Sequence, residues 1–150
     1  MNLRFGRARN GWLPTTLELD GGETLSFYVS YLPYDFVSEL VAALAGVLDG
    51  PGEHVARICE EPTEHAWRFR AFDPSAVILE IITFHDVRER RGNVVARAWG
   101  SPMDVVLPLW RGLRELASRA GAEGWHKHWS EPFPADALDR LTERIEAARA

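Results

Sequence analysis

The stretch Ala76-Val-Ile-Leu-Glu-Ile-Ile-Thr-Phe-His85 decides the fold, because apolar residues occupy both of its alternating faces and β-branched residues dominate it. Such a run is typical of a strand that is covered on both sides or lies at the centre of a sheet. Glu80 interrupts it and shares one face with Ile78 and Ile82. We therefore predict a buried, central strand over residues 76–85.

Three more strand-like segments flank this stretch at short spacing. They cover residues 54–60, 65–72 and 93–100. The links between the four segments are turn-like and too short for a parallel crossover, which predicts an antiparallel meander. Trp67 and Phe69 share one face of their segment, whereas Arg68 and Arg70 share the other. We therefore expect one face of the sheet to be partly open to solvent.

The chain before the meander contains a second strand pattern. Residues 12–19 and 23–31 alternate between apolar and polar positions on either side of Asp20-Gly21-Gly22, which predicts a hairpin. The first ten residues contain Arg4, Arg7 and Arg9 and have no clear period. They predict a loose lead-in.

Apolar residues at helical spacing predict three helices. The first follows the capping residue Asp35 and ends at Asp49-Gly50-Pro51-Gly52. The second follows Ser101-Pro102, and Pro108 within it predicts either a kink or a later start near Leu107. The last follows Pro134 and carries a narrow apolar stripe.

Together these segments have the order ββαββββαα. They predict a single α+β domain over residues 1–150, built from an antiparallel sheet of about six strands with three helices mainly on one face. The sequence contains no internal repeat and no low-complexity linker.

Charge and cysteine content restrict the classes of partner. The 150 residues include 17 basic and 22 acidic side chains, and the net charge of -5 disfavours nucleic acid or an anionic membrane as the main partner. Cys59 is the single cysteine, so no intrachain disulfide forms. Charges stand where a signal peptide needs its apolar core, and no stretch reaches about 18 apolar residues. We therefore expect a cytoplasmic protein.

The acidic turn between the first two meander segments is one candidate docking site. It brings three carboxylates and a histidine together in the run Glu60-Glu-Pro-Thr-Glu-His65. The pattern fits either a solvated turn or an acidic loop that binds a basic partner. The docking residues would be Glu60, Glu61, Glu64 and His65.

The segment Trp125-His-Lys-His-Trp129 is the second candidate. In an extended segment, His126 and His128 would share one face at a spacing that suits a metal, but the sequence supplies no third ligand at metal-site spacing, so we predict no metal. Trp125 and Trp129 either anchor a surface connection against the helices or, with the two histidines, form a partner-contact patch.

A carboxylate within the central strand must be paired or shift its proton affinity. For Glu80, pairing with arginines of adjacent strands is the simpler interpretation. The alternative is a polar cleft for a small enzyme or ligand-binding domain, made by Arg68, Arg70, Glu80 and Arg97. Cys59 fits a small buried hydrophobe better than a nucleophile. The sequence has no phosphate-binding loop and no nucleophile elbow, so we predict no catalytic residue and no cofactor.

Three short motifs carry a family resemblance. They are Ser30-Tyr-Leu before an apolar helix, Glu60-Glu-Pro62 followed by Trp67, and His128-Trp-Ser-Glu-Pro-Phe-Pro134. With them the chain resembles a group of small uncharacterised bacterial α+β proteins, which in turn resemble the immunity proteins of polymorphic toxin systems. The resemblance implies a compact cytoplasmic domain that blocks a toxin by binding to it, and it implies no catalytic residues.

The sequence thus favours a non-catalytic cytoplasmic binding protein with a protein partner. An immunity-type inhibitor that occludes a basic toxin domain is the specific form that we expect. The alternatives are the small enzyme or ligand-binding domain with the cleft described above, and a structural protein that self-associates as a homodimer.

Overall fold

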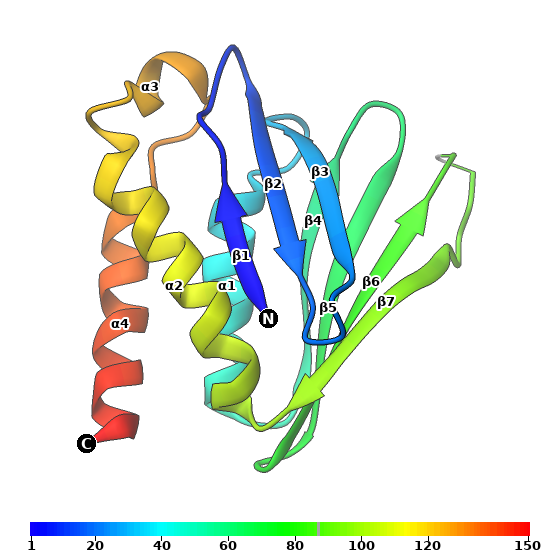
Figure 1. Cartoon of the computed structure of the whole chain (residues 1–150), viewed down its shortest axis with the longest axis vertical. Helices are drawn as coiled ribbons and strands as arrows, with labels where there is room; N and C mark the ends of the chain where they lie inside the picture. Colours follow the sequence, from blue (N-terminus) through cyan, green and yellow to red (C-terminus); the bar gives the residue numbers. More distant parts are fainter. Residues whose placement is uncertain (87) are drawn as a thin grey trace.

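The computed structural model describes every residue of the chain except Val87. Its elements, in chain order, are β1 (Asn2–Phe5), β2 (Trp12–Glu18), β3 (Thr24–Ser30), α1 (Phe36–Asp49), β4 (Gly52–Cys59), β5 (Glu64–Asp73), β6 (Ala76–Phe84), β7 (Asn93–Gly100), α2 (Pro102–Ala120), α3 (Trp125–His128) and α4 (Ala135–Arg149) (Figure 1). The α+β class predicted from the sequence is confirmed.

The described strands form two antiparallel sheets, so the prediction of one sheet of about six strands is wrong. The first sheet has the order β1-β2-β3 and the second the order β4-β5-β6-β7. Helix α1 separates β3 from β4 in the chain. Where β3 approaches β4, the backbone N–H of Tyr28 donates to the Glu60 carboxylate at 2.8 Å. In a continuous sheet this N–H would donate to a backbone carbonyl of the neighbouring strand, whereas here it donates to a side chain.

Strand β6 lies between β5 and β7, as the sequence predicts for the central strand. Val77, Leu79 and Ile81 on its inner face are fully or almost fully buried under the helices and the first sheet. Glu80 and Ile82 on its outer face are also buried. The inner face of β6 is therefore removed from water, and its outer face is buried at Glu80 and Ile82 and half-buried at Ile78, which accounts for its doubly apolar sequence.

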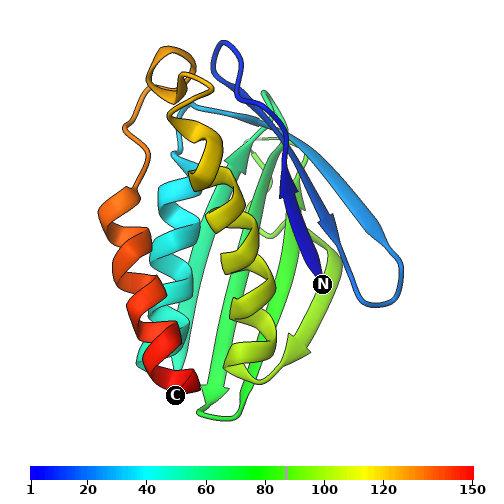
Figure 2. The same ribbon diagram turned by 60° about the vertical axis from the view of Figure 1, so that its left-hand side comes forward.

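The helices lie on one side of the four-stranded sheet (Figure 2). Helices α1 and α2 bring Leu40, Leu44, Leu109 and Leu113 into the core that Trp67 and the inner face of β6 complete. Helix α4 packs against α1 and α2 through its stripe of Leu138, Leu141 and Ile145. Across the described chain, none of the helices combines the length and the hydropathy that crossing a lipid bilayer requires.

The first residues form a strand, so the prediction of a loose lead-in is wrong. Leu3 and Phe5 alternate inward and are buried, and Leu3 lies opposite Leu17 of β2. Two apolar residues among three arginines are too few for a period to be read from the sequence. Burial against α2 decides the conformation instead.

Helices α1 and α2 begin where the sequence pattern places them, after Asp35 and after Ser101. Helix α2 begins at Pro102 and continues through Pro108, so the later start near Leu107 is wrong. A capping box fixes this start, because Asp104 N–H donates to Ser101 Oγ at 3.1 Å and Ser101 N–H donates to Asp104 Oδ2 at 2.9 Å. Asp35 precedes α1 but makes no side-chain cap; its carboxylate accepts from Ser38 Oγ at 2.6 Å instead.

A glycine sets how closely α2 approaches the first sheet. A Cβ atom on Gly112 would lie 2.6 Å from the carbonyl oxygen of Leu3 and 2.9 Å from its Cβ. The nearest atom belongs to the β1 backbone, so it cannot rotate away as a side chain would. Glycine at 112 therefore allows the helix and the strand to touch.

Replacing Gly112 with alanine tests this contact. Overpacking lowers the free energy of unfolding by about 1–3 kcal/mol, which exceeds the gain of about 1 kcal/mol in helix propensity. Gly121→Ala is the matched control, because Gly121 has an ordinary helical φ of -63° and open space around it. Urea denaturation should show G112A less stable and G121A unchanged or more stable. A G112A protein as stable as the control would contradict the close approach.

Candidate functional site

The face of the four-stranded sheet that points away from the helices is the candidate site, and we call it the open face. Strand register places alternate residues of β4–β7 on it, so their side chains lie in rows across the sheet. Its residues are Glu53, Val55, Arg57, Ala66, Arg68, Arg70, Phe72, Ile78, Glu80, Ile82, Arg97 and Trp99.

Glu80 stands at the centre of the open face and is paired with three arginines. Its Oε1 accepts from Arg68 Nη2 at 2.9 Å and lies 3.4 Å from Arg70 Nη1, and its Oε2 accepts from Arg97 Nε at 3.2 Å. Arg68 and Arg97 flank Glu80 in the same row, on β5 and β7. The predicted pairing of Glu80 is confirmed. We call these four residues the Glu80 cluster.

The arginines hold the pKa of the Glu80 carboxyl below its ordinary value. The hydrogen bond from Arg68 is the largest cause, burial opposes it, and the bond from Arg97 adds to it. Glu80 is therefore a stable carboxylate at neutral pH and unsuited to donate a proton. The predicted cleft residues do come together, but on a surface, because the side chain of Arg97 is 57% exposed while that of Glu80 is 8% exposed.

One end of the open face is aromatic. Trp99 follows Arg97 on the same face of β7 and is 77% exposed, and Phe72 at the end of β5 is 57% exposed. Ile78 lies directly opposite Trp99. Large exposed aromatic side chains beside arginines are the composition that interface centres favour.

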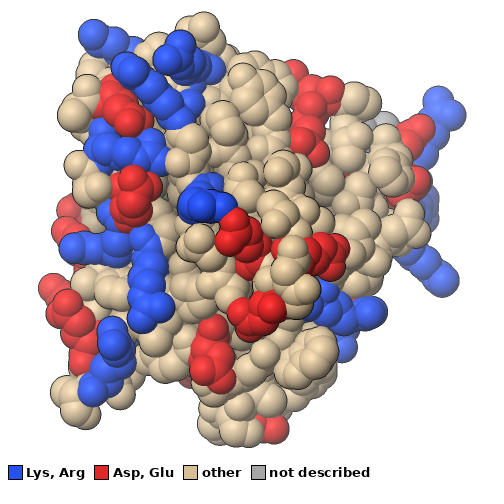
Figure 3. Space-filling model, in the orientation of Figure 1, with Lys and Arg blue, Asp and Glu red and all other residues tan. Residues whose placement is uncertain are grey.

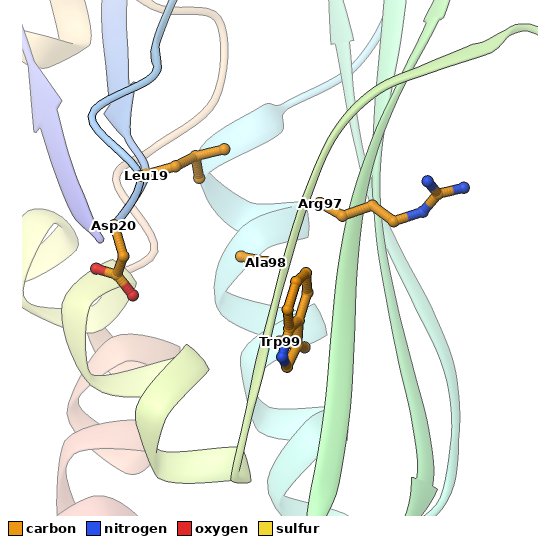
Figure 4. Close-up of a pocket in the computed structure, with 6 residues that line it drawn as sticks. Leu19, Asp20, Arg97, Ala98 and Trp99 are labelled. Atoms are coloured by element: carbon orange, nitrogen blue, oxygen red, sulfur yellow. The ribbon is translucent and has the colours of Figure 1, made fainter.

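Trp99 also borders a shallow pocket of about 290 Å³ between β7 and the β2–β3 turn. Figure 4 shows Leu19 reaching from the turn toward Ala98, whereas Arg97 points away from the pocket toward the neighbouring strands of the sheet. Strand β7 is the edge of its sheet, so the pocket lies beside the strand's outer edge.

The acidic turn is tied into the molecule. Glu60 accepts from the backbone of Tyr28 and also pairs with the ring Nε2 of His65, whose Nδ1 lies 2.9 Å from Thr83 Oγ1. Glu61 accepts from Ser30 Oγ at 3.1 Å. Two of the predicted docking carboxylates thus join β3 to the second sheet, and His65 is buried.

Glu64 has a different environment from its two neighbours. It contacts the hydroxyl of Tyr34, and the hydrogen bond from this hydroxyl to the carboxylate is the largest cause that raises the pKa of Tyr34. The Arg57 guanidinium lies 4.1 Å from the centre of the Tyr34 ring and pairs with Glu39. Glu64 thus borders the open face without belonging to the Glu80 cluster.

The second predicted docking segment is a short helix, α3, so the condition of an extended segment, under which His126 and His128 would share one face, is not met. Trp125 and Trp129 are buried, and their indole N–H groups donate to Glu131 O at 3.2 Å and to Asp35 Oδ1 at 3.1 Å. The two tryptophans anchor the connection to the core. This burial leaves little of either indole for a partner to contact.

The two histidines of α3 also have different surroundings. His126 is exposed, whereas His128 accepts from the Asn10 backbone N–H through Nδ1 at 3.1 Å. Among the residues with described positions, no three His, Cys, Asp or Glu side chains converge as a metal site would require.

Cys59 is buried, and burial is the largest cause that raises the pKa of its thiol, which fits the predicted hydrophobic role.

The aromatic end of the open face is the part that sequence reasoning missed. Trp99 lies two residues after Arg97, so the alternation of segment 93–100 placed both on one face. The signal was present in that alternation. Which of the six tryptophans stay exposed depends on where α2 and α3 pack, and no local pattern reports this.

Comparison with protein families, with curated proteins and with solved structures finds no match for this chain.

Replacing Glu60 with alanine tests whether the acidic turn joins the two sheets. The change removes the acceptor for the Tyr28 N–H and the partner of His65, so we expect the free energy of unfolding to fall by about 1–3 kcal/mol. Glu23→Ala, on the exposed β2–β3 turn, should stay within about 0.5 kcal/mol of wild type. Urea denaturation measures both. Equal stability of the two variants would show that Glu60 is not a structural residue.

Replacing Glu80 with glutamine tests the cluster. The lowered pKa means that Glu80 stabilises the fold above its ordinary value of 4.5 and loses this contribution as the pH falls through the folded-state pKa. At neutral pH we expect E80Q to be less stable by about 1–3 kcal/mol, because the arginines lose their counter-charge.

The pH dependence separates this effect from a general loss of packing. From about pH 5 to about pH 3 the unfolding free energy of wild type should fall more steeply than that of E80Q. Glu146→Gln, at an exposed position of α4, should follow the wild-type curve. Parallel curves for wild type and E80Q would mean that the three arginines do not lower the pKa of Glu80.

Proposed function

We propose that this chain is a non-catalytic binding protein that docks a protein partner on the open face. The observation that carries the proposal is the exposed Trp99 beside the Glu80 cluster. Tryptophan and arginine are the residue types most enriched among binding hot spots, and a broad strand surface suits a protein better than a small molecule.

The position of the site on the fold supports the proposal. The helices and the first sheet stabilise the inner face of the four-stranded sheet, so the outer face is free to take contacts without a loss of core packing. Glu80 is stabilised as a carboxylate by its arginines, which gives it a positioning role, and among the described residues no free acid or base lies at the centre of this face. We therefore do not carry the enzymatic alternative forward.

The specific form we propose is an immunity-type inhibitor that covers the active site of a toxin. Its support is the sequence resemblance described above and the absence of catalytic motifs from the sequence. The proposal includes a cytoplasmic location, for which the single cysteine is the support. We place the docking surface on the open face instead of the acidic turn and α3, because Glu60 and Glu61 are engaged within the molecule and both tryptophans of α3 are buried. A basic toxin domain was expected from the acidic turn, so that part of the expectation is not retained.

Site-specific cross-linking tests the docking surface. A photoreactive phenylalanine analogue replaces Trp99 in the full chain, expressed in its native host, and a second protein carries the analogue at Glu146 of α4 as the control. Both positions are exposed, so the fold should tolerate either change. We expect a covalent adduct with a different polypeptide from position 99 and none from position 146.

Two outcomes would contradict the proposal. The absence of an adduct from position 99 would show that the open face is unused, and an adduct with a second copy of the chain alone would favour the self-associating alternative. The inhibitory form has its own test. The cross-linked partner should arrest growth when expressed alone and should cease to do so with this chain; a harmless partner would exclude the immunity role.

A further inference from the structure

The open face has more positive charge at its centre than the rest of the chain would suggest. The Glu80 cluster contains three guanidinium groups and one carboxylate, in a protein with a net charge of -5. On β4 the nearest acidic neighbour is Glu53, opposite Arg70 in the register. Glu53 offsets part of the positive charge on the β4 side of the cluster, so the excess of positive charge is larger on the β7 side, where Arg97 lies.

Charges elsewhere follow a different distribution. In Figure 3, Lys and Arg side chains gather on the helix side and again at the right-hand edge, where Figure 1 places the β6–β7 turn. Asp and Glu side chains are interspersed with the basic ones in both regions, and several more lie between them. That turn contains Arg88, Arg90 and Arg91, all exposed, together with Asp86 and Glu89. The turn lies at the end of the open face opposite Trp99, and Ala66 and Ile82 separate it from the Glu80 cluster.

Arg97 keeps donors for a further acceptor. Glu80 takes its Nε, which leaves the two terminal nitrogens of a guanidinium that is more than half exposed. The planar fork of a guanidinium matches a carboxylate with two parallel hydrogen bonds, a geometry that a lysine does not offer. Arg97 is therefore the member of the cluster best placed to bind a carboxylate from outside.

An apolar contact lies within reach of that carboxylate. Trp99 shares the face and strand of Arg97, and Ile78 lies opposite Trp99. Together they form an apolar surface one row away from Arg68, Glu80 and Arg97, with Arg70 beside Ile78 in the same row. A ligand that satisfies both features carries an acidic group and an apolar or aromatic group a few ångströms apart.

We infer that the partner segment recognised by the open face is acidic and apolar, with an Asp or Glu side chain bound by Arg97 and an apolar side chain packed on Trp99. This inference rests on the proposed function and names the chemistry of its partner. Phosphates would also fit the guanidinium fork, but Glu53, Glu80 and the net negative charge oppose a polyanion. A protein segment with a few carboxylates avoids that repulsion.

Selection from a displayed library of random dodecapeptides tests the chemistry without knowledge of the natural partner. Wild-type protein is the bait, and peptides that also bind R97E are removed. We expect the retained sequences to be enriched in Asp or Glu next to Leu, Phe or Trp. Enrichment of basic peptides, or of none, would overturn the inference.

Calorimetry on one selected synthetic peptide provides the quantitative test. Its affinity should fall about tenfold or more in R97Q and in W99A, as for hot-spot residues. R97Q avoids a new negative charge beside Glu80, so its folding is less at risk than that of R97E. Arg140→Glu, at an exposed position of α4, is the matched control and should bind as wild type does. Equal affinity of R97Q and wild type would overturn the inference.

Two further results separate the alternatives. If the protein binds an oligothymidylate at physiological ionic strength and R97Q does not, the ligand of the open face is a nucleic acid, and the inferred acidic protein segment is wrong. An adduct from position 99 in the host, together with charge-indifferent peptide selection, would reject this inference and leave the proposed function standing. Acidic peptides that bind through Arg97, without any adduct in the host, would support the acidic recognition chemistry and contradict the proposed docking of a protein partner in the host.

Discussion

A carboxylate in the central strand of a sheet must be neutralised where it stands, and the pairing of Glu80 with three arginines meets that requirement. Because the partners come from β5 and β7, the cluster also links the three strands across the outer face. Glu80 and its arginines occupy positions that apolar side chains would otherwise fill. The same cluster therefore stabilises the sheet and keeps its outer face polar at the centre.

The inner face has the opposite character. Trp67 and Phe69 are fully buried there, and Phe27 of the first sheet and Phe36 of α1 pack against the Trp67 ring. The first sheet is joined to the second at its edge by the Glu60 carboxylate. Helices and first sheet together remove one face of β4–β7 from water. All of the binding capacity that we assign to the second sheet consequently lies on its outer face.

Local pattern was sufficient for most of the elements and insufficient for their assembly. The doubly apolar run identified β6, and the alternation of Trp67 with Arg68 identified an outer face, because strand side chains alternate strictly. The division into two sheets is a matter of long-range contacts, such as that between the Tyr28 N–H and the Glu60 carboxylate, whose residues are far apart in sequence. Strand β1 was missed for a related reason, because its two buried residues, Leu3 and Phe5, are buried only once α2 packs against the strand.

The candidate site shows the same limit. The pairing of Glu80 with arginines was predicted from the order of the strands alone. The acidic turn and α3 were predicted as docking sites from their composition. Composition does not tell whether a tryptophan is a core anchor or an exposed contact. Trp125 and Trp129 are buried in the core, whereas Trp99 is exposed because it lies on the outer face of β7.

Nuclear magnetic resonance of the tryptophan indole N–H groups, with a soluble paramagnetic relaxation agent, tests most directly whether the open face is free. In the isolated protein, the Trp99 signal should be the most strongly broadened, and the signals of Trp67, Trp125 and Trp129 should be protected. A protected Trp99 signal would mean that the face is already covered, and strong broadening of Trp125 and Trp129 would return the docking surface to α3.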